Sequence, residues 1–233
     1  MIRNKICFQR KYLYYKHIVL KDKWNDINIL VTGFEPFGPY KYNPVQDVTE
    51  FFDWKKLGKL KIKWIVLSSI YGAFTEIEWY IKKNQPDIIL SMWLASRVNG
   101  IRIETVGNNI RHSNYADAKW KLINNSKIEK KWPEKIRLNT QAQKLFDVLI
   151  RHDIPAEISN DAEWFICNDL IYQTARYIEK NKLNIQQCFI HTPWTQDYLD
   201  KVDIEDWKMK ISKDMLINAV KVLLVELSEE IIS

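Results

Sequence analysis

The chain has 233 residues, of which 46% are hydrophobic and 27% are charged. This length and composition suit one α/β domain with a full core and lie far from those of disordered chains. The formal net charge is +6, but residues 1–26 alone contribute +5, from seven basic side chains against two acidic ones. The remainder is close to neutral, which argues against a globally basic nucleic-acid-binding protein.

Apolar runs and helical periodicities alternate along the chain after residue 26. A buried strand is predicted over 28–32, and the loop 33–43 leads to a helix over 44–52 that Asn43 caps and Pro44 begins. Residues 111–138 are polar and without period, which predicts a long loop. The other predicted strands cover 61–69, 88–92, 101–106, 156–159 and 188–190, and the other predicted helices cover 74–83, 141–150, 165–178 and 213–227. This alternation predicts a largely parallel sheet covered by helices on both faces.

The cysteines and the N-terminal segment indicate in which cellular compartment the protein resides. Cys7, Cys167 and Cys188 are odd in number and have no paired spacing, which argues against a disulfide framework and for a reducing environment. No apolar run reaches the roughly 18–20 residues of a membrane span, and the N-terminus lacks a signal-peptide core. We therefore expect a cytoplasmic protein without membrane contact. We also expect one domain over 27–233 and a basic extension over 1–26, whose deletion leaves that domain folded.

Three predicted segments end at the edge where ligand sites of parallel sheets lie: the loop after Thr32, the segment after Ser159, and His191. Cys167 follows a predicted strand and lies early in a helix, where free amides and the helix dipole favour a thiolate. A single Cys with a distant His and an acid is typical of a thiol hydrolase. A buried structural cysteine remains the alternative for Cys167, and a hydrogen-bonded strand-end histidine remains the alternative for His191.

Cys188 offers a comparison within the same strand. It lies three residues before His191, so the two side chains should point to opposite faces of the sheet, and we expect Cys188 in the core. The remaining histidines are less suited to catalysis. His17 lies in the extension, and His112 and His152 lie in polar segments.

Four segments together resemble the pyroglutamyl peptidase I family, the pyrrolidone-carboxylate peptidases. They are VTGFEPFG at 31–38 followed by Asn43 and Pro44, IRIE at 101–104 followed by Asn109, ISN through CN at 158–168, and FIHTP at 189–193. Their order matches the family, as do the intervals of 63 residues from Glu104 to Cys167 and 24 residues from Cys167 to His191. The resemblance spans about residues 27–227.

The resemblance implies a fold, an activity and a catalytic triad. The fold is a three-layer α/β/α sandwich of the phosphorylase/hydrolase-like type, with a mostly parallel twisted sheet. The activity is that of a cysteine exopeptidase that removes N-terminal pyroglutamate from peptides through a thioester. Cys167 is then the nucleophile, His191 the base and Glu104 the acid that orients the imidazole. No metal or organic cofactor is implied. The expected partners are pyroglutamylated peptides, without nucleic acid or membrane, and family members often form homodimers or homotetramers.

The resemblance also implies a substrate site. Phe34 and Phe37 match aromatic residues that line the lactam pocket in the family, and Asn43 belongs to the same motif. A flat, uncharged pyroglutamyl ring suits an aromatic slot, whereas a free ammonium there would be poorly solvated. The alternative is that Phe34 and Phe37 are core residues beneath a turn.

The chain departs from the family pattern around this site. Trp93 and Glu163 stand where glycines are expected, and Asn114 stands where the family has an arginine that serves the oxyanion. Arg111, in the same loop as Asn114, is the favoured replacement, Arg97 is a second candidate, and the absence of any replacement stays open. These departures keep two alternatives open. One is a related cysteine amidohydrolase with a changed acyl group, and the other is a non-catalytic binding protein that retains the fold.

Overall fold

The structure is a computed structural model, and it describes residues 26–38, 40–52, 56–200 and 209–232. The predictions made for Cys7, His17 and the N-terminal extension fall on residues outside these ranges, apart from Asp26. Asp26 forms an ion pair of 2.5 Å with Lys61. None of the helices in the described ranges has both the length and the apolar character needed to cross a membrane.

A seven-stranded sheet forms the centre of the molecule, with the strand order β2-β3-β1-β4-β9-β5-β8. Its strands are β1 (Ile27–Phe34), β2 (Lys56–Leu57), β3 (Leu60–Leu67), β4 (Ile88–Leu94), β5 (Ile101–Glu104), β8 (Ala156–Ser159) and β9 (Gln186–Thr192). All neighbours are parallel except β2 with β3 and β5 with β9. In the antiparallel register of β5 and β9, Arg102 lies opposite His191 and Glu104 lies opposite Phe189.

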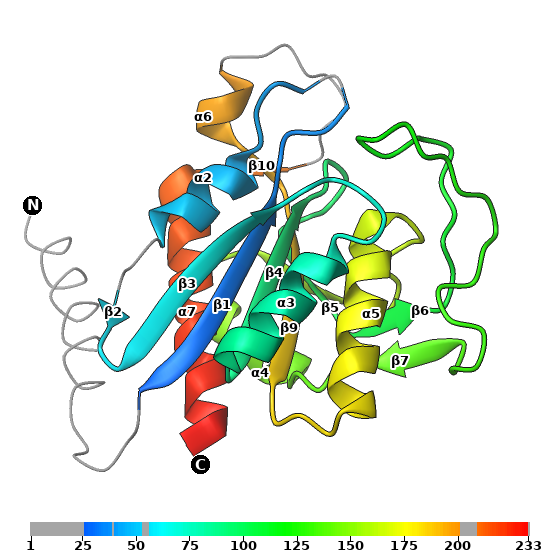
Figure 1. The fold of residues 1–233 in the computed structure, drawn as a ribbon. Helices are drawn as coiled ribbons and strands as arrows, with labels where there is room; N and C mark the ends of the chain where they lie inside the picture. Colours follow the sequence, from blue (N-terminus) through cyan, green and yellow to red (C-terminus); the bar gives the residue numbers. More distant parts are fainter. Residues whose placement is uncertain (1–25, 39, 53–55, 201–208, 233) are drawn as a thin grey trace, which may run out of the picture.

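Helices cover both faces of this sheet (Figure 1). One face packs against α2 (Pro44–Phe51), α4 (Ala142–Arg151) and α7 (Lys213–Ile232), and the other packs against α3 (Phe74–Asn84) and α5 (Ile166–Lys180). Each face has its own hydrophobic cluster, because alternate strand residues such as Val31 and Leu30 point in opposite directions. The predicted three-layer α/β/α sandwich with a mostly parallel sheet is confirmed.

The same alternation places the two C-terminal cysteines on opposite faces. Cys188 is fully buried in the cluster beneath α2, α4 and α7, whereas Cys167 belongs to the cluster beneath α3 and α5. Phe189 lies in the second cluster, and His191, two residues further along β9, projects to the same face. The prediction that Cys188 is a core residue facing away from His191 is confirmed.

The loop after β1 is fixed by the residues that begin α2. The Asn43 side chain accepts from the Val45 amide at 3.1 Å and donates to the Phe34 carbonyl at 2.9 Å, so it caps the helix as predicted and holds the loop. A Cβ on Gly33 would lie 2.3 Å from Thr49 Oγ1, so a larger residue there would push α2 away from β1.

Some predicted elements differ from those observed. The predicted strand over 101–106 divides at Thr105 into β5 and β6 (Val106–Asn108), and β6 leaves the main sheet to pair with β7 (Lys135–Arg137). The predicted loop 111–138 is mostly loop, and Asn109 anchors it through bonds to the Glu129 and Trp132 backbone. The short elements β10 (Trp194–Thr195), α6 (Gln196–Leu199) and β11 (Lys210–Ile211) had no predicted counterpart.

Candidate active site

A buried histidine–carboxylate pair lies at the ends of β9 and β5. His191 Nδ1 is 2.7 Å from Glu104 Oε1, and the two residues are 5% and 0% exposed. The second oxygen of Glu104 has no hydrogen-bond partner in the described part of the chain. Because Nδ1 faces the carboxylate, Nε2 is the ring nitrogen left to exchange a proton with a reacting group.

Cys167 is the second residue of α5 and is almost fully buried. Its Sγ donates to the Ala162 carbonyl at 3.4 Å. Burial raises the pKa of the Cys167 thiol far above its ordinary value, and the carboxylates of Glu104 and Glu163 raise it further. Backbone amides of Asn168 and Cys167 lower this pKa, as expected at a helix start, but burial outweighs them. The resting thiol is therefore protonated, and Glu104 lies within electrostatic reach of it.

Asn168 fixes the start of α5 against the segment that follows Glu104. This fully buried side chain accepts from the Asn108 amide at 2.7 Å and donates to the carbonyls of Asn108 and Ile110 at 2.9 and 2.8 Å. A Cβ on Gly107 would lie 2.9 Å from Tyr172 Cα, so the glycine permits the close packing of β6 on α5. Asn168 thus links the segment that follows Glu104 to the helix that carries Cys167.

Five aromatic side chains, which we call the aromatic cluster, gather between β1, β4 and the start of α5. Its members are Phe34, Phe37, Tyr71, Trp93 and Phe165. Trp93 contacts Phe34 edge-on with ring centroids 4.5 Å apart, and Phe165 lies 5.5 Å from Phe37, 5.6 Å from Tyr71 and 6.3 Å from Trp93. Phe165 precedes Cys167 by two residues, so the cluster borders the candidate nucleophile.

Arg111, Asn114 and Arg97, the residues considered for the oxyanion site, lie in different surroundings. Arg111 Nε donates to Asp169 Oδ1 at 2.7 Å, and Asp169 lies two residues beyond Cys167 on α5. This pair holds the guanidinium at the first turn of the helix. Asn114 and Arg97 are exposed.

Sequence reasoning named Phe34, Phe37 and Arg111 but missed Phe165, Tyr71 and Asp169. Phe165 and Asp169 lie within two residues of Cys167, and that proximity was an available signal for both. Tyr71 follows β3 and approaches the site from a part of the chain that carried no predicted role.

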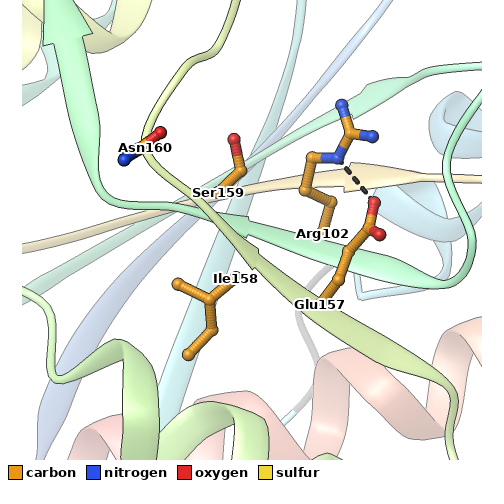
Figure 2. Close-up of a pocket in the computed structure, with 5 residues that line it drawn as sticks. All are labelled: Arg102, Glu157, Ile158, Ser159 and Asn160. Atoms are coloured by element: carbon orange, nitrogen blue, oxygen red, sulfur yellow. Dashed lines mark hydrogen bonds and ion pairs between the residues drawn. The ribbon is translucent and has the colours of Figure 1, made fainter.

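A separate hollow of about 470 Å³ opens at the outer edge of the sheet (Figure 2). Arg102 and Glu157 form an ion pair of 2.7 Å there, and Ile158, Ser159 and Asn160 complete its lining. Arg102 lies opposite His191 in the β5–β9 register, so the hollow flanks the histidine–carboxylate pair. In the described ranges, no three His, Cys, Asp or Glu side chains are grouped so as to hold a metal ion.

Comparison with known proteins identifies the family of this chain. A model of the pyroglutamyl peptidase family matches residues 27–230. The chain belongs to this family. Pyrrolidone-carboxylate peptidase 1 of Saccharolobus solfataricus is 30% identical over 196 residues, which are 84% of this chain and 91% of the relative. The crystal structure of a mutant pyrrolidone carboxyl peptidase from Pyrococcus furiosus superposes with a TM-score of 0.83 at 29% identity, covering 88% of this chain and 99% of the other.

The two residues expected to depart from the family pattern, Glu163 and Trp93, both lie near the candidate site. Glu163 adopts a left-handed backbone conformation with φ of 59°, which a glycine would adopt at lower cost. Trp93 belongs to the aromatic cluster and lies opposite His191 in the β4–β9 register. Glu163 and Trp93 therefore belong to the surroundings of the candidate residues Cys167 and His191.

Proposed function

We propose that this protein is a cysteine exopeptidase that removes N-terminal pyroglutamate from peptides, with Cys167 as nucleophile, His191 as base and Glu104 as the orienting acid. The observation that carries the proposal is the buried bond of 2.7 Å between His191 Nδ1 and Glu104 Oε1, within electrostatic reach of a cysteine at a helix start. Membership of the pyroglutamyl peptidase family supports the same reaction.

The reaction begins from a protonated thiol, because burial raises the pKa of Cys167. His191 Nε2 takes the thiol proton as the sulfur attacks the carbonyl carbon between pyroglutamate and the next residue, and the carbonyl π electrons move to oxygen. Glu104 stabilises the imidazolium that forms. The oxyanion then collapses, the C–N bond breaks, and His191 returns the proton to the leaving amine. Water, deprotonated by His191, hydrolyses the thioester and releases pyroglutamate.

The acyl group is proposed to bind beside the aromatic cluster, with Phe34 and Phe37 at the lactam ring. An uncharged ring loses little hydration on entering an apolar aromatic site, whereas the ammonium of an ordinary N-terminus would lose much more. Asn43 serves this site by holding the loop that carries Phe37, through its bond to the Phe34 carbonyl. Arg111 is the proposed charged donor near the oxyanion, and Asn114 is a proposed contact from the exposed loop.

A coumarin assay tests the proposal directly. The full chain should release 7-amino-4-methylcoumarin from the L-pyroglutamyl amide, and iodoacetamide or Cys167→Ser should abolish the release. The matched L-prolyl amide, which carries an ammonium-forming ring nitrogen in place of the lactam, should be a poor substrate. Release that survives Cys167→Ser would overturn the assignment of the nucleophile.

A related amidohydrolase with a changed acyl group is the second candidate, and the position of Trp93 within the aromatic cluster favours it. A panel of coumarin amides with different acyl rings separates the two. Faster turnover of another acyl amide than of the pyroglutamyl amide would identify this second activity.

A further inference from the structure

The hydroxyl group of Tyr71 is buried beside the site without a partner. Tyr71 is 8% exposed, and its ring stands perpendicular to that of Phe165 at a centroid distance of 5.6 Å. Its hydroxyl oxygen has no hydrogen-bond partner among the residues that the structure describes. An unsatisfied buried polar group costs about 1–3 kcal/mol, so this hydroxyl is poised to gain from a partner that arrives with a ligand.

Two buried carboxylates fix the backbone around Tyr71. The Tyr71 amide donates to Asp117 Oδ2 at 3.0 Å, and the Gly72 amide donates to Asp169 Oδ2 at 3.0 Å. Asp117 and Asp169 are 4% and 1% exposed, so both bonds are shielded from water. A donor held this firmly requires little reorganisation when charge develops nearby, which is the condition for effective stabilisation of a transition state.

Tyr71 and Cys167 lie in the same part of the fold. Both residues belong to the hydrophobic cluster beneath α3 and α5, and Phe165 connects them because it touches Tyr71 and precedes Cys167 by two residues. The pKa of Tyr71 is raised to about 12, chiefly by burial and then by the charges of Asp169, Asp117 and Cys167, while Arg111 lowers it. The hydroxyl therefore keeps its proton near neutral pH and lies within the electric field of the sulfur.

We propose that the Tyr71 hydroxyl donates a hydrogen bond to the oxyanion formed when Cys167 attacks the scissile carbonyl. The proton stays on Tyr71 throughout, so the hydroxyl stabilises charge without exchanging a proton. This assignment rests on the proposed function and completes its oxyanion site. Asn114, which replaces the family arginine, is exposed, and Arg111 Nε is already engaged by Asp169. A neutral, preorganised donor would offset part of the loss of that arginine.

Tyr71→Phe removes the hydroxyl and keeps the ring against Phe165. We expect kcat on the pyroglutamyl coumarin amide to fall about 10²–10³-fold, as for the loss of one oxyanion donor, with KM changed less than about threefold. The melting temperature should stay the same or rise, because the hydroxyl has no partner to lose. Tyr172→Phe is the matched control, since its buried hydroxyl donates to the Pro133 carbonyl at 2.6 Å. That control should keep the parental kcat.

Two inhibitors distinguish an oxyanion donor from a donor to the lactam carbonyl of the substrate. Pyroglutamyl aldehyde adds the Cys167 thiol across its carbonyl and places a hydroxyl or oxyanion in the site, whereas 2-pyrrolidone carries only the lactam. Tyr71→Phe should weaken the aldehyde by at least tenfold and leave 2-pyrrolidone unchanged. Equal weakening of both inhibitors, or of neither, would overturn the assignment.

Binding of the aldehyde requires no turnover, so the two proposals can fail separately. If the parent binds the aldehyde but hydrolyses no pyroglutamyl amide, the proposed function fails, and weakened aldehyde binding in Tyr71→Phe would still support the donor. If the parent is active and Tyr71→Phe matches it in kcat, the donor assignment fails and the proposed function stands.

Discussion

Replacing Glu104 with Gln removes one negative charge from a fully buried position and keeps the shape of the side chain. In the parent, Glu104 Oε1 lies 2.7 Å from His191 Nδ1, and neither residue has appreciable contact with solvent. A glutamine can still accept a hydrogen bond from Nδ1, but it cannot stabilise the imidazolium by charge. It can also present its NH2 group and thereby select the other imidazole tautomer. We therefore expect a folded enzyme with a defect in proton transfer.

The size of that defect follows from the separation of the charges. Their centres are about 4 Å apart in the ion pair, which gives an interaction of about 4 kcal/mol at an effective dielectric constant of about 20. Each 1.36 kcal/mol corresponds to a factor of ten in rate, so kcat should fall about 10³-fold. Stability should be maintained or improved, because Glu104 Oε2 has no hydrogen-bond partner in the described chain and a buried carboxylate is costly to desolvate.

Coumarin release at saturating substrate measures kcat, and thermal unfolding followed by circular dichroism checks the fold. Glu157→Gln is the matched control, because Glu157 is also a strand carboxylate but pairs with Arg102 and is partly solvent-exposed. The control should stay within about twofold of the parent. A Glu104→Gln enzyme that folds and keeps kcat within threefold of the parent would mean that Glu104 has only a structural role.

Three further predictions concern α5 and its surroundings. Cys167→Ala should abolish hydrolysis while Cys188→Ala retains it, and equal activity of the two variants would refute the assignment. Glu163→Gln removes a carboxylate that raises the pKa of Cys167, so iodoacetamide should alkylate Cys167 faster at a fixed pH, as followed by mass spectrometry; an unchanged rate would contradict this field effect. Asn168→Ala breaks the three hydrogen bonds of a buried side chain and should lower the free energy of unfolding in urea by about 3 kcal/mol, and a loss below about 1 kcal/mol would show that this anchor is weak.

The regular elements were predictable where apolar runs and helical periods were long. β9 shows the limit of this reasoning, since it was predicted over 188–190 but extends over Gln186–Thr192. Its outer positions are polar yet buried: Gln187, for example, is 3% exposed and donates to the Ile171 carbonyl at 3.1 Å. A polar residue that is held in the core by a tertiary hydrogen bond gives no local signal for a strand. β10 and β11 could not be predicted for a similar reason. Each has two residues, and they pair with each other although they are far apart in the sequence, so no local pattern indicates them.

The candidate catalytic residues were chosen from motifs, but their mutual geometry could not be predicted in that way. The bond between His191 and Glu104 depends on the antiparallel neighbours β9 and β5 within an otherwise mostly parallel sheet. The raised pKa of Cys167 depends on burial, which position near a helix start does not reveal. Tyr71 is held in place because its own amide donates to Asp117 and the Gly72 amide donates to Asp169. These carboxylates lie 46 and 97 residues along the chain from their respective donors. Contacts of this kind follow from the packed loops rather than from any spacing in the sequence.

Trp93 lies between the proposed acyl site and His191, the proposed base. It lies opposite His191 in parallel neighbouring strands, so the two side chains project from the same face of the sheet. Its indole contacts Phe34 at 4.5 Å and lies 6.4 Å from Phe37 and 6.3 Å from Phe165, in space that a glycine would leave empty. The indole thus reduces the space available to an acyl ring on this face, and inserting additional methylenes into packed space costs about 1–3 kcal/mol. Ring size is therefore the property of the acyl group that Trp93 should select if the acyl site lies beside the aromatic cluster, and the panel of coumarin amides measures that selection.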